Sequence, residues 1–515
     1  MKSTAWRGRV LRAVLIAVVG FLVGRYWDPY YGFTSLLQAD PVTESLLPAS
    51  LRDAPVFIHR DVGRYDGAYY AQIATSPLLR DPALAEAVDD LGYRARRILL
   101  SALAWLAAGG DAVTAVHVYA WINPLLWLIL AWQTWRLFPV EDRRATFAWM
   151  GMMLASGVLA SVRLALTDLA ALVLLAGTLA LVERGRAAGA AGLLGLAGLT
   201  RETALLGVVA LWPEKGADVR IWLRRAFLAG LAALPLACWL VYLWRATGPS
   251  GAGSSNLALP FVAWLGRAQE LWRVTGVETN RGLVLGGWLD YIALTAQMLY
   301  LFLHSQKTSP WWRTGFAYAV FGLCLGSAVW EGLPGAASRV LLPLTLAFNL
   351  FATRRRAAWL WLVVGNLSLV SGIWALLSPP GAPHTLTSHA GDGHSYVLET
   401  DARWSVAEWN RKWRWAWCDG DGAVTFRIWP HVPQVRVELQ VRGVTPRELE
   451  VRHAGAVVWH GHIGDRPQWI ALPELPTVRG RLELELRSET PPAQEGVANT
   501  ARGISFACFG ARLAE

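Results

Sequence analysis

The chain has 515 residues, of which 54% are hydrophobic and only 17% are charged. This composition excludes an ordinary soluble enzyme and favours a polytopic membrane protein. The formal net charge of +10 does not indicate nucleic-acid binding. The arginines cluster at the ends of apolar runs, where basic residues orient helices in a membrane.

The first apolar run, at about 10–27, follows Lys2, Arg7, Arg9 and Arg12. Basic residues before a first span place the N-terminus in the cytoplasm. No small-residue cleavage site follows, so we expect an uncleaved signal anchor, with a cleaved signal peptide as the alternative. Residues 28–97 then form a long external loop. The apolar stretch 98–110 is too short to cross a bilayer and predicts an interfacial or re-entrant helix.

The apolar segments that follow, read with the basic clusters between them, predict about eleven crossings. We expect a multi-pass protein of the bacterial inner membrane, whose C-terminus lies in the periplasm or outside the cell. The pair 188–200 and 203–213 is broken by "TRET", and a Gly/Ser-rich external loop occupies 246–282. The other expected spans are 113–137, 146–162, 168–183, 226–245, 283–304, 314–330, 340–352 and 357–377.

The composition changes after the last span, so that a transmembrane part covers 1–377. Residues 378–395 form a Pro/Gly-rich linker. From 396 to 515, polar and apolar residues alternate with period two, which predicts an all-β sandwich or jelly roll on the external face. Cys418 and Cys508 lie in this part, and we expect them to form a disulfide there.

Four groups of ionisable residues fall near the outer boundary on this topology. Acids and arginines gathered at one depth would suit a phosphate-bearing substrate beside a general base. Each group also has a structural explanation: a solvated loop acid, an ion pair, the filling of a helix break, or an interfacial anchor. The groups are Asp61 and Asp66, Arg163 and Asp168, Arg201 and Glu202, and Glu331 and Arg339, with Arg94, Arg96 and Arg97 before the short helix.

The stretch "RYDGAYYAQIA", Arg64–Ala74, resembles the first luminal loop of GPI-mannosyltransferase-like proteins. The layout over about 10–352 is similar to the GT-C superfamily of membrane glycosyltransferases, which take sugar from a polyprenyl-phosphate carrier. The resemblance implies that Asp66 is the general base, with Asp61 as the second choice. Tyr65 and Tyr69 would then stack on sugar rings.

Three other motifs extend the resemblance. "LAGLTRETALL" is similar to the helix break of the aminoarabinose-transferase branch, which assigns Arg201 to the carrier phosphate. "SRVLLPL" likewise assigns Arg339 to the carrier, with Arg97 as a further cation, and "VRLALTDLAAL" would put Asp168 near the site. Arg201 and Glu202 stand where that branch has Lys-Gly. The chain has no clear Asp-x-Asp pair, so a divalent metal is possible but no motif supports it.

The resemblance therefore implies an inverting glycosyltransferase that uses a polyprenyl-phosphate-linked sugar donor in contact with membrane lipid. Its acceptor would be a glycan, a lipid or a protein. Two alternatives remain open. A transporter or flippase of a lipid-linked or charged solute should place ionisable residues near the bilayer midplane and show inverted repeats. A non-catalytic sugar-binding membrane protein would tolerate the loss of Asp66.

Overall fold

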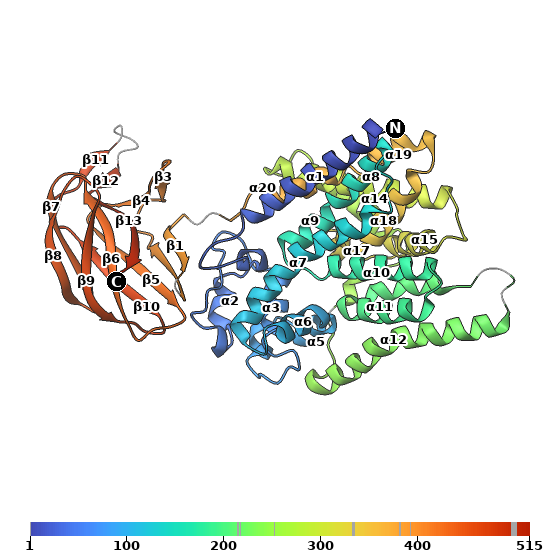
Figure 1. Cartoon of the computed structure of the whole chain (residues 1–515), viewed down its shortest axis with the longest axis horizontal. Helices are drawn as coiled ribbons and strands as arrows, with labels where there is room; N and C mark the ends of the chain where they lie inside the picture. Colours follow the sequence, from blue (N-terminus) through green and yellow to red (C-terminus); the bar gives the residue numbers. More distant parts are fainter. Residues whose placement is uncertain are drawn as a thin grey trace. The chain divides into compact units, whose positions relative to one another are not determined.

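The computed structural model describes residues 2–213, 216, 218–251, 253–331, 335–380, 383–391, 393–495 and 502–514. The chain divides into two compact units. The helical unit comprises residues 1–26, 33–51 and 57–379, and the β unit comprises residues 27–32, 52–56 and 380–515. Figure 1 labels the elements of both units, and each unit is described by itself below.

The helical unit begins with α1 (Lys2–Gly24), which is followed by a long loop of short helices. The loop elements are η1 (Thr34–Leu37), α2 (Pro41–Leu46), η2 (Ala49–Leu51), α3 (Asp66–Ile73), α4 (Leu84–Ala87), α5 (Leu91–Arg94) and η3 (Ala95–Arg97). The bundle helices in its first half are α6 (Leu99–Ala107), α7 (Ala112–Trp135), α8 (Arg143–Met153), α9 (Ser156–Arg163), α10 (Asp168–Glu183), α11 (Ala187–Thr200), η4 (Glu202–Leu211) and α12 (Val219–Thr247).

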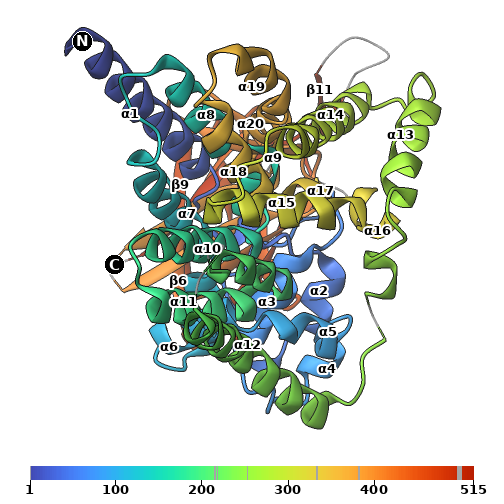
Figure 2. The ribbon, with the colours of Figure 1, turned by 90° about the vertical axis from the view of Figure 1, so that its right-hand side faces the viewer.

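The second half of the bundle contains both long and very short helices. They are η5 (Ser254–Asn256), α13 (Val262–Val274), α14 (Arg281–Leu303), α15 (Pro310–Leu323), α16 (Ser327–Trp330), α17 (Ala336–Val340), α18 (Leu342–Ala352), η6 (Arg356–Ala358), α19 (Trp359–Gly365) and α20 (Leu369–Leu377). Figure 2 shows α10, α11 and α12 stacked as neighbours, with α13 at the edge of the bundle. Every residue of α18 is buried, and its two polar side chains are hydrogen-bonded: Thr345 donates to Gln297 at 2.8 Å and Asn349 donates to Asn366 at 3.1 Å.

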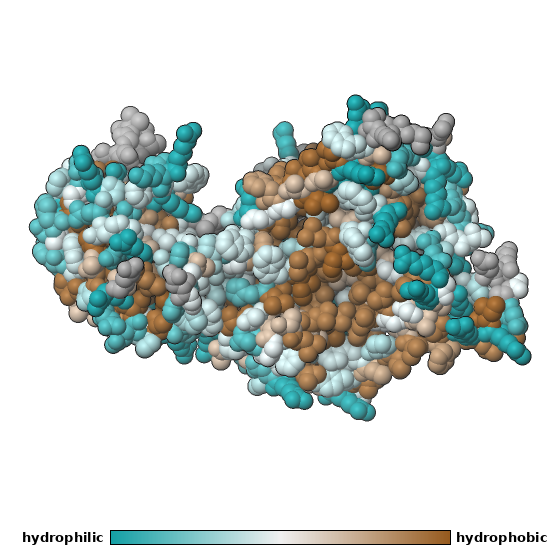
Figure 3. Space-filling model, in the orientation of Figure 1, coloured by the Kyte–Doolittle hydropathy of each residue, from teal (hydrophilic) through white to brown (hydrophobic). Residues whose placement is uncertain are grey.

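The described part of the chain contains five helices that are long and apolar enough to cross a membrane by length and composition. They are Ala112–Trp135, Arg143–Arg163, Val219–Thr247, Arg281–Leu303 and Trp359–Leu377. Figure 3 shows hydrophobic side chains gathered across the middle of the helical unit. Only 22% of the most apolar window of α12 is buried, so most of that surface is left for lipid to cover. The number of about eleven crossings stays a prediction.

Several segments predicted from the sequence can be compared with the helices of this unit. The stretch 98–110 contains the short helix α6, and "TRET" spans the end of α11, the extended residue Arg201 and the start of η4. The predicted Gly/Ser-rich loop at 246–282 is not loop throughout, because α13 occupies Val262–Val274 within it. Trp264, Leu271 and Trp272 gave this segment helical apolar spacing, which the neighbouring glycines and serines obscured.

The loop helix α3 is buried along its length after Asp66. Its second residue is glycine for a steric reason: a Cβ at Gly67 would lie 2.2 Å from the carbonyl oxygen of Leu164 and 3.2 Å from that of Leu37. Backbone atoms cannot rotate away as a side chain can. Gly67 therefore lets the start of α3 approach the bundle closely, and this contact fixes the position of Asp66.

The β unit consists of antiparallel strands in two main sheets. The six-stranded sheet has the order β1-β2-β5-β10-β7-β8, and the five-stranded sheet has the order β3-β4-β13-β6-β9. The strands are β1 (Thr385–Gly391), β2 (His394–Thr400), β3 (Glu408–Trp409), β4 (Arg414–Cys418), β5 (Asp421–Trp429), β6 (Gln434–Gly443), β7 (Arg447–His453), β8 (Ala456–Ile463), β9 (Gln468–Pro476), β10 (Arg481–Arg487), β11 (Ala493–Glu495), β12 (Arg502–Ile504) and β13 (Phe506–Leu513).

One hydrophobic core joins residues from both main sheets, among them Phe426 on β5, Leu439 on β6 and Phe506 on β13. Two sheets that share a core in this way form a β-sandwich. In β10, "RLELELR", buried and exposed residues alternate without exception. This is the period-two pattern that predicted the strand.

Two details of this unit differ from the sequence expectations. Strand β1 lies within 378–395, so that stretch is not only a linker, and the β unit begins before residue 396. The predicted disulfide is also wrong, since Cys418 and Cys508 are both free. They lie on the neighbouring strands β4 and β13, but Cys418 is opposite Phe506 and Cys508 is opposite Ala416. This diagonal separation is too great for a disulfide.

The predicted external loop 28–97 contributes to both units. Its segments 27–32 and 52–56 belong to the β unit, where the Tyr31 hydroxyl donates to Glu399 at 2.8 Å. The Ser388 hydroxyl likewise donates to Asp28 at 2.5 Å. The sandwich is therefore completed by residues from the N-terminal loop.

Candidate functional site

A cavity of about 410 Å³ in the helical unit is lined by most of the ionisable residues that the sequence singled out. We call it the arginine cavity. Its polar lining consists of Tyr65, Asp66, Tyr93, Arg96, Arg97, Arg201, Glu202, Thr203, Asn256 and Arg339, and its apolar wall includes Leu257, Phe321, Leu325, Val329 and Val340. Four arginines against two carboxylates make the lining electropositive. The volume suits a small ligand or the head of a larger one.

Elements far apart in the sequence bring these residues together. Tyr65 and Asp66 start α3, and Arg97 ends the 3₁₀ turn η3. Arg201 lies in extended backbone between α11 and η4, so the helix break predicted at "TRET" presents its side chain to the cavity. Arg339 lies in the last turn of α17. The cavity therefore forms where short or broken helices expose polar groups among apolar ones.

Asp168 does not line the cavity, but its carboxylate contacts two of the arginines that do. It is the first residue of α10, where the helix dipole favours a carboxylate, and only 2% of its side chain is exposed. It forms an ion pair with Arg201, and its other oxygen lies 3.7 Å from Nη1 of Arg339. One buried carboxylate thus fixes both guanidinium groups on one wall of the cavity.

Arg339 also donates a hydrogen bond of 2.7 Å to the Tyr65 hydroxyl. Burial raises the pKa of Tyr65, against the opposing effect of Arg339, so the phenol stays protonated at neutral pH. The Tyr65 hydroxyl therefore helps to fix the guanidinium group of Arg339 at the lining of the cavity.

Arg97 is held by a different set of partners. It donates to the hydroxyls of Tyr70 at 2.6 Å and Tyr93 at 3.2 Å, and its Nε lies 3.5 Å from Glu202. Asn256 also donates to the Tyr93 hydroxyl, at 3.0 Å. Most partners of Arg97 are neutral hydroxyls, so much of its charge is available to an anion in the cavity.

Asp66 is not free of an ion pair, contrary to what its place in a loop indicated. Its Oδ1 lies 2.8 Å from Nη1 of Arg94, and Arg94 also binds Asp89 through hydrogen bonds of 2.9 Å and 2.8 Å. Burial acts to raise the pKa of Asp89, but the hydrogen bonds from Arg94 outweigh it and hold that pKa below its usual value. A quarter of the Asp66 side chain remains exposed, so a ligand could still reach it.

Three expected residues lie elsewhere. Asp61 is exposed and does not line the arginine cavity. Tyr69 is buried, and the guanidinium groups of Arg94 and Arg64 lie over its ring, so it is not placed to stack on a sugar. Arg163 does not form the ion pair with Asp168 that its spacing suggested. It lies over the ring of Tyr26, at 5.1 Å from the ring centroid.

Sequence reasoning missed part of the site. An interfacial anchor is the structural explanation that the sequence offers for Arg94 and Arg96, yet Arg94 pairs with Asp66 and Arg96 lines the cavity. Tyr93 and Asn256 were not singled out. Asp290 was also missed, although a single acid within the apolar run 283–304 is a recognised signal for a functional residue in a membrane protein.

Within the described residues, no group of three or more histidine, cysteine, aspartate or glutamate side chains is arranged to hold a metal ion. The acids of the arginine cavity are instead engaged by arginines. Asp66 pairs with Arg94, and Glu202 lies near Arg97. These carboxylates would have to leave their guanidinium partners to bind a cation.

Comparison with known proteins does not assign the chain to a family. No protein-family model matches it, and no curated protein matches it. Among solved structures it is similar to the arabinosyltransferase EmbB from Mycobacterium smegmatis, with a TM-score of 0.26 and 13% sequence identity. The match covers 86% of this chain but 62% of that one, so the chain spans less than two thirds of the length of that protein. Similarity at this level does not establish an activity.

Proposed function

We propose that this protein is an inverting GT-C-type glycosyltransferase that moves a sugar from a polyprenyl-phosphate carrier to an acceptor. The observation that carries the proposal is the meeting of Arg201 and Arg339 with Asp66 around one cavity. A lipid-linked sugar phosphate offers an anion for the arginines and an anomeric carbon for attack. The sequence resemblance to membrane glycosyltransferases points to the same residues.

In the proposed reaction, Asp66 accepts the proton of an acceptor hydroxyl. The acceptor oxygen then forms a bond to the anomeric carbon as the bond from that carbon to the phosphate oxygen breaks, with inversion. The leaving group is the polyprenyl phosphate anion. Arg201 and Arg339, with Arg97, stabilise the charge that grows on this anion, and cations held in place before the reaction stabilise it most.

Asp168 supports this role without touching the substrate. Fixed by their shared carboxylate, Arg201 and Arg339 lose little conformational freedom when phosphate binds. Their two charges exceed the single charge of Asp168, so the group keeps a net positive charge toward the cavity. The Tyr65 hydroxyl accepts a hydrogen bond from Arg339 and helps to hold that guanidinium group in position.

The proposed location follows the sequence topology. The arginine cavity would open on the external side of a bacterial inner membrane, where lipid-linked donors rather than nucleotide sugars are available. The N-terminus would be cytoplasmic and the β unit extracytoplasmic. A topology reporter that works only outside the cytoplasm should be active when it is fused at residue 390. If only a reporter that works in the cytoplasm were active there, this orientation would be rejected.

A transporter of a lipid-linked or charged solute is the second candidate, because one observation favours it. Asp290 is a carboxylate within the membrane-spanning segment α14, where ionisable residues often mark a transport path. The two candidate functions differ in what happens to the lipid-linked sugar. A transferase breaks the bond between sugar and phosphate, whereas a transporter moves the solute without breaking it.

The test uses the purified protein in lipid nanodiscs with polyprenyl-phosphate-linked sugars and a mixed acceptor fraction. We expect sugar transfer with release of polyprenyl phosphate. Arg201→Ala should lose most activity, whereas Arg201→Lys keeps the charge without the two-pronged guanidinium and should retain part. Arg163→Ala is the matched control, because Arg163 lies over Tyr26 and does not line the cavity. Intact donor moved across proteoliposomes, with no bond cleavage, would favour the transporter.

A further inference from the structure

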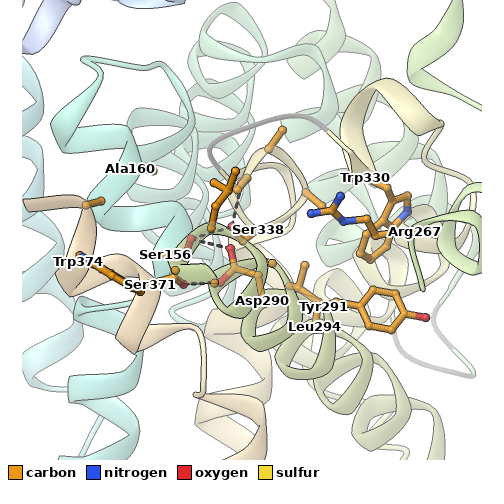
Figure 4. A pocket seen from close by; sticks show the side chains of 18 of the residues that line it. Ser156, Ala160, Arg267, Asp290, Tyr291, Leu294, Trp330, Ser338, Ser371 and Trp374 are labelled. Atoms are coloured by element: carbon orange, nitrogen blue, oxygen red, sulfur yellow. Dashed lines mark hydrogen bonds between the residues drawn. The ribbon is translucent and has the colours of Figure 1, made fainter. Parts of the chain in front are cut away.

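A second cavity, of about 330 Å³, surrounds Asp290 on α14, and we call it the Asp290 cavity. Asp290 accepts hydrogen bonds from the hydroxyls of Ser156 at 2.8 Å and Ser371 at 2.6 Å. Ser338 donates to the Ser156 hydroxyl at 3.3 Å. Helices α9, α14, α17 and α20 therefore converge on one carboxylate, as Figure 4 shows.

The remaining walls combine one cation with aromatic rings. Arg267 of α13 lines the cavity and lies beside Trp330 in Figure 4. Trp374 can line it because residue 282 is glycine: a Cβ there would lie 2.4 Å from the Trp374 ring. Gly286 and Gly287 also belong to the lining. Glycines along one face of α14 thus leave a groove that leads to Asp290.

The two cavities share a wall but differ in charge. Ala336 of α17 lines both, Ser338 lines the Asp290 cavity, and the next residue, Arg339, lines the arginine cavity. Four arginines in the arginine cavity suit an anion. The Asp290 cavity presents one carboxylate, one guanidinium and several hydroxyls, so it has no excess of positive charge for a phosphate.

We propose that the Asp290 cavity binds the saccharide of the acceptor substrate. A neutral polyol fits each of its features. The hydroxyl groups of a sugar can donate hydrogen bonds to the Asp290 carboxylate and accept them from Arg267. The faces of the sugar ring can pack against the aromatic side chains of the cavity. A metal cation would face repulsion from Arg267. This assignment rests on the proposed function, since only a transferase needs an acceptor site beside its donor site.

The test measures ligand protection of single cysteines in the full chain in nanodiscs. The exposed Cys238 is replaced by serine and Cys324 by alanine, while Cys418 and Cys508 are buried and stay. Leu283→Cys reports on the Asp290 cavity and Leu257→Cys on the arginine cavity, and both leucines are exposed lining residues. The probes are butyl glycosides of glucose, galactose, mannose and arabinose, and separately a polyprenyl monophosphate.

We expect at least one glycoside to slow maleimide labelling at Leu283→Cys but not at Leu257→Cys. Asp290→Asn should raise the glycoside concentration needed for half-protection about tenfold or more, the loss expected for a hydrogen bond to a charged group. Ser371→Ala, which removes one partner of Asp290, should raise it less. Having two variants keeps the test decisive if one of them does not fold.

Three results would overturn the assignment: no protection at Leu283→Cys by any glycoside, protection unchanged in both variants, or protection at Leu257→Cys instead. The polyprenyl monophosphate tests the proposed function independently and should protect Leu257→Cys alone. If it fails there while a glycoside protects Leu283→Cys, the saccharide site stands and the proposed donor site does not.

Discussion

Asp66 lies 2.8 Å from Nη1 of Arg94, and Arg94 at the same time binds both carboxylate oxygens of Asp89. This arrangement allows Asp66 to accept a proton without leaving Arg94 unpaired. When Asp66 takes a proton and becomes neutral, Arg94 keeps Asp89 as its counter-ion, so no unpaired buried charge is left behind. Asp89 is therefore a positioning residue for the proposed reaction.

Replacing Asp89 tests this relationship. In Asp89→Asn, Arg94 has only Asp66 as a carboxylate partner and holds it more strongly, which makes proton transfer to Asp66 less favourable. We expect kcat to fall by about tenfold, the effect of roughly 1.4 kcal/mol on the barrier. KM should not change, because Asp89 does not line the arginine cavity. An unchanged kcat would show that Arg94 does not restrain Asp66.

Asp168 should be essential for stability as well as for activity. Asp168→Asn leaves Arg201 and Arg339 without their shared carboxylate, and breaking a buried ion pair costs about 3–5 kcal/mol. We expect a clearly lower thermal unfolding midpoint, followed by tryptophan fluorescence in detergent. Glu270→Gln is the control, because the exposed pair of Glu270 with Arg273 on α13 should contribute little. Equal midpoints for the two variants would contradict the role of Asp168.

Gly67 and Gly63 offer a matched pair within the first-loop motif. Gly67→Ala puts a methyl group 2.2 Å from the Leu164 carbonyl oxygen, whereas a Cβ at Gly63 meets nothing within 4 Å. Overpacking of this kind costs about 1–3 kcal/mol. We expect Gly67→Ala to lower both the unfolding midpoint and transfer activity, and Gly63→Ala to change neither. A neutral Gly67→Ala would mean that α3 can move away from the bundle.

His59 predicts a pH dependence of stability. Burial lowers its pKa to about 4, and its Nε2 lies 2.8 Å from the Ser35 carbonyl oxygen, to which the neutral ring donates. An unfolded histidine has its usual pKa of about 6.5, so below that value the unfolded state binds the extra proton. Stability should therefore be lost as pH falls from about 6.5 toward 4, by up to about 3 kcal/mol.

His59→Gln should keep the donor to Ser35 and remove most of this pH dependence. The measurement is the unfolding midpoint of both proteins at several pH values between 7 and 4.5. The difference between the two curves isolates histidine from the carboxylates that titrate in the same range. Parallel curves would show that His59 is not held neutral.

The sequence predicted local features well and tertiary pairing poorly. The break between α11 and η4 could be read from "TRET", and β10 from its strict alternation, because both depend on neighbouring residues. The partners of Asp168 could not be read in this way. Arg163, which is close to Asp168 in the sequence, lies over the ring of Tyr26 instead. The ion-pair partners of Asp168 are Arg201 and Arg339, which are distant in the sequence.

The same limit explains the errors in the β unit and the loop. Cys418 and Cys508 do reach adjacent strands, but a register offset of two residues decides against a disulfide, and the composition does not determine register. Asp66 lies in a predicted loop, where a solvated carboxylate without a fixed ion pair is the usual expectation. Its partner Arg94 is 28 residues away in the sequence, and the fold of the loop brings the two side chains together.

The central claim is that Asp66 is the base of a sugar transfer, and the most direct measurement compares Asp66→Asn with Asp61→Asn. Asparagine preserves size and removes the basic oxygen, so turnover of a polyprenyl-phosphate-linked sugar by purified Asp66→Asn should fall at least about a hundredfold. Asp61→Asn should keep the wild-type rate, because Asp61 is exposed outside the arginine cavity. Wild-type turnover in Asp66→Asn would contradict the account, and if Asp61→Asn were inactive in the same assay, the base would be Asp61.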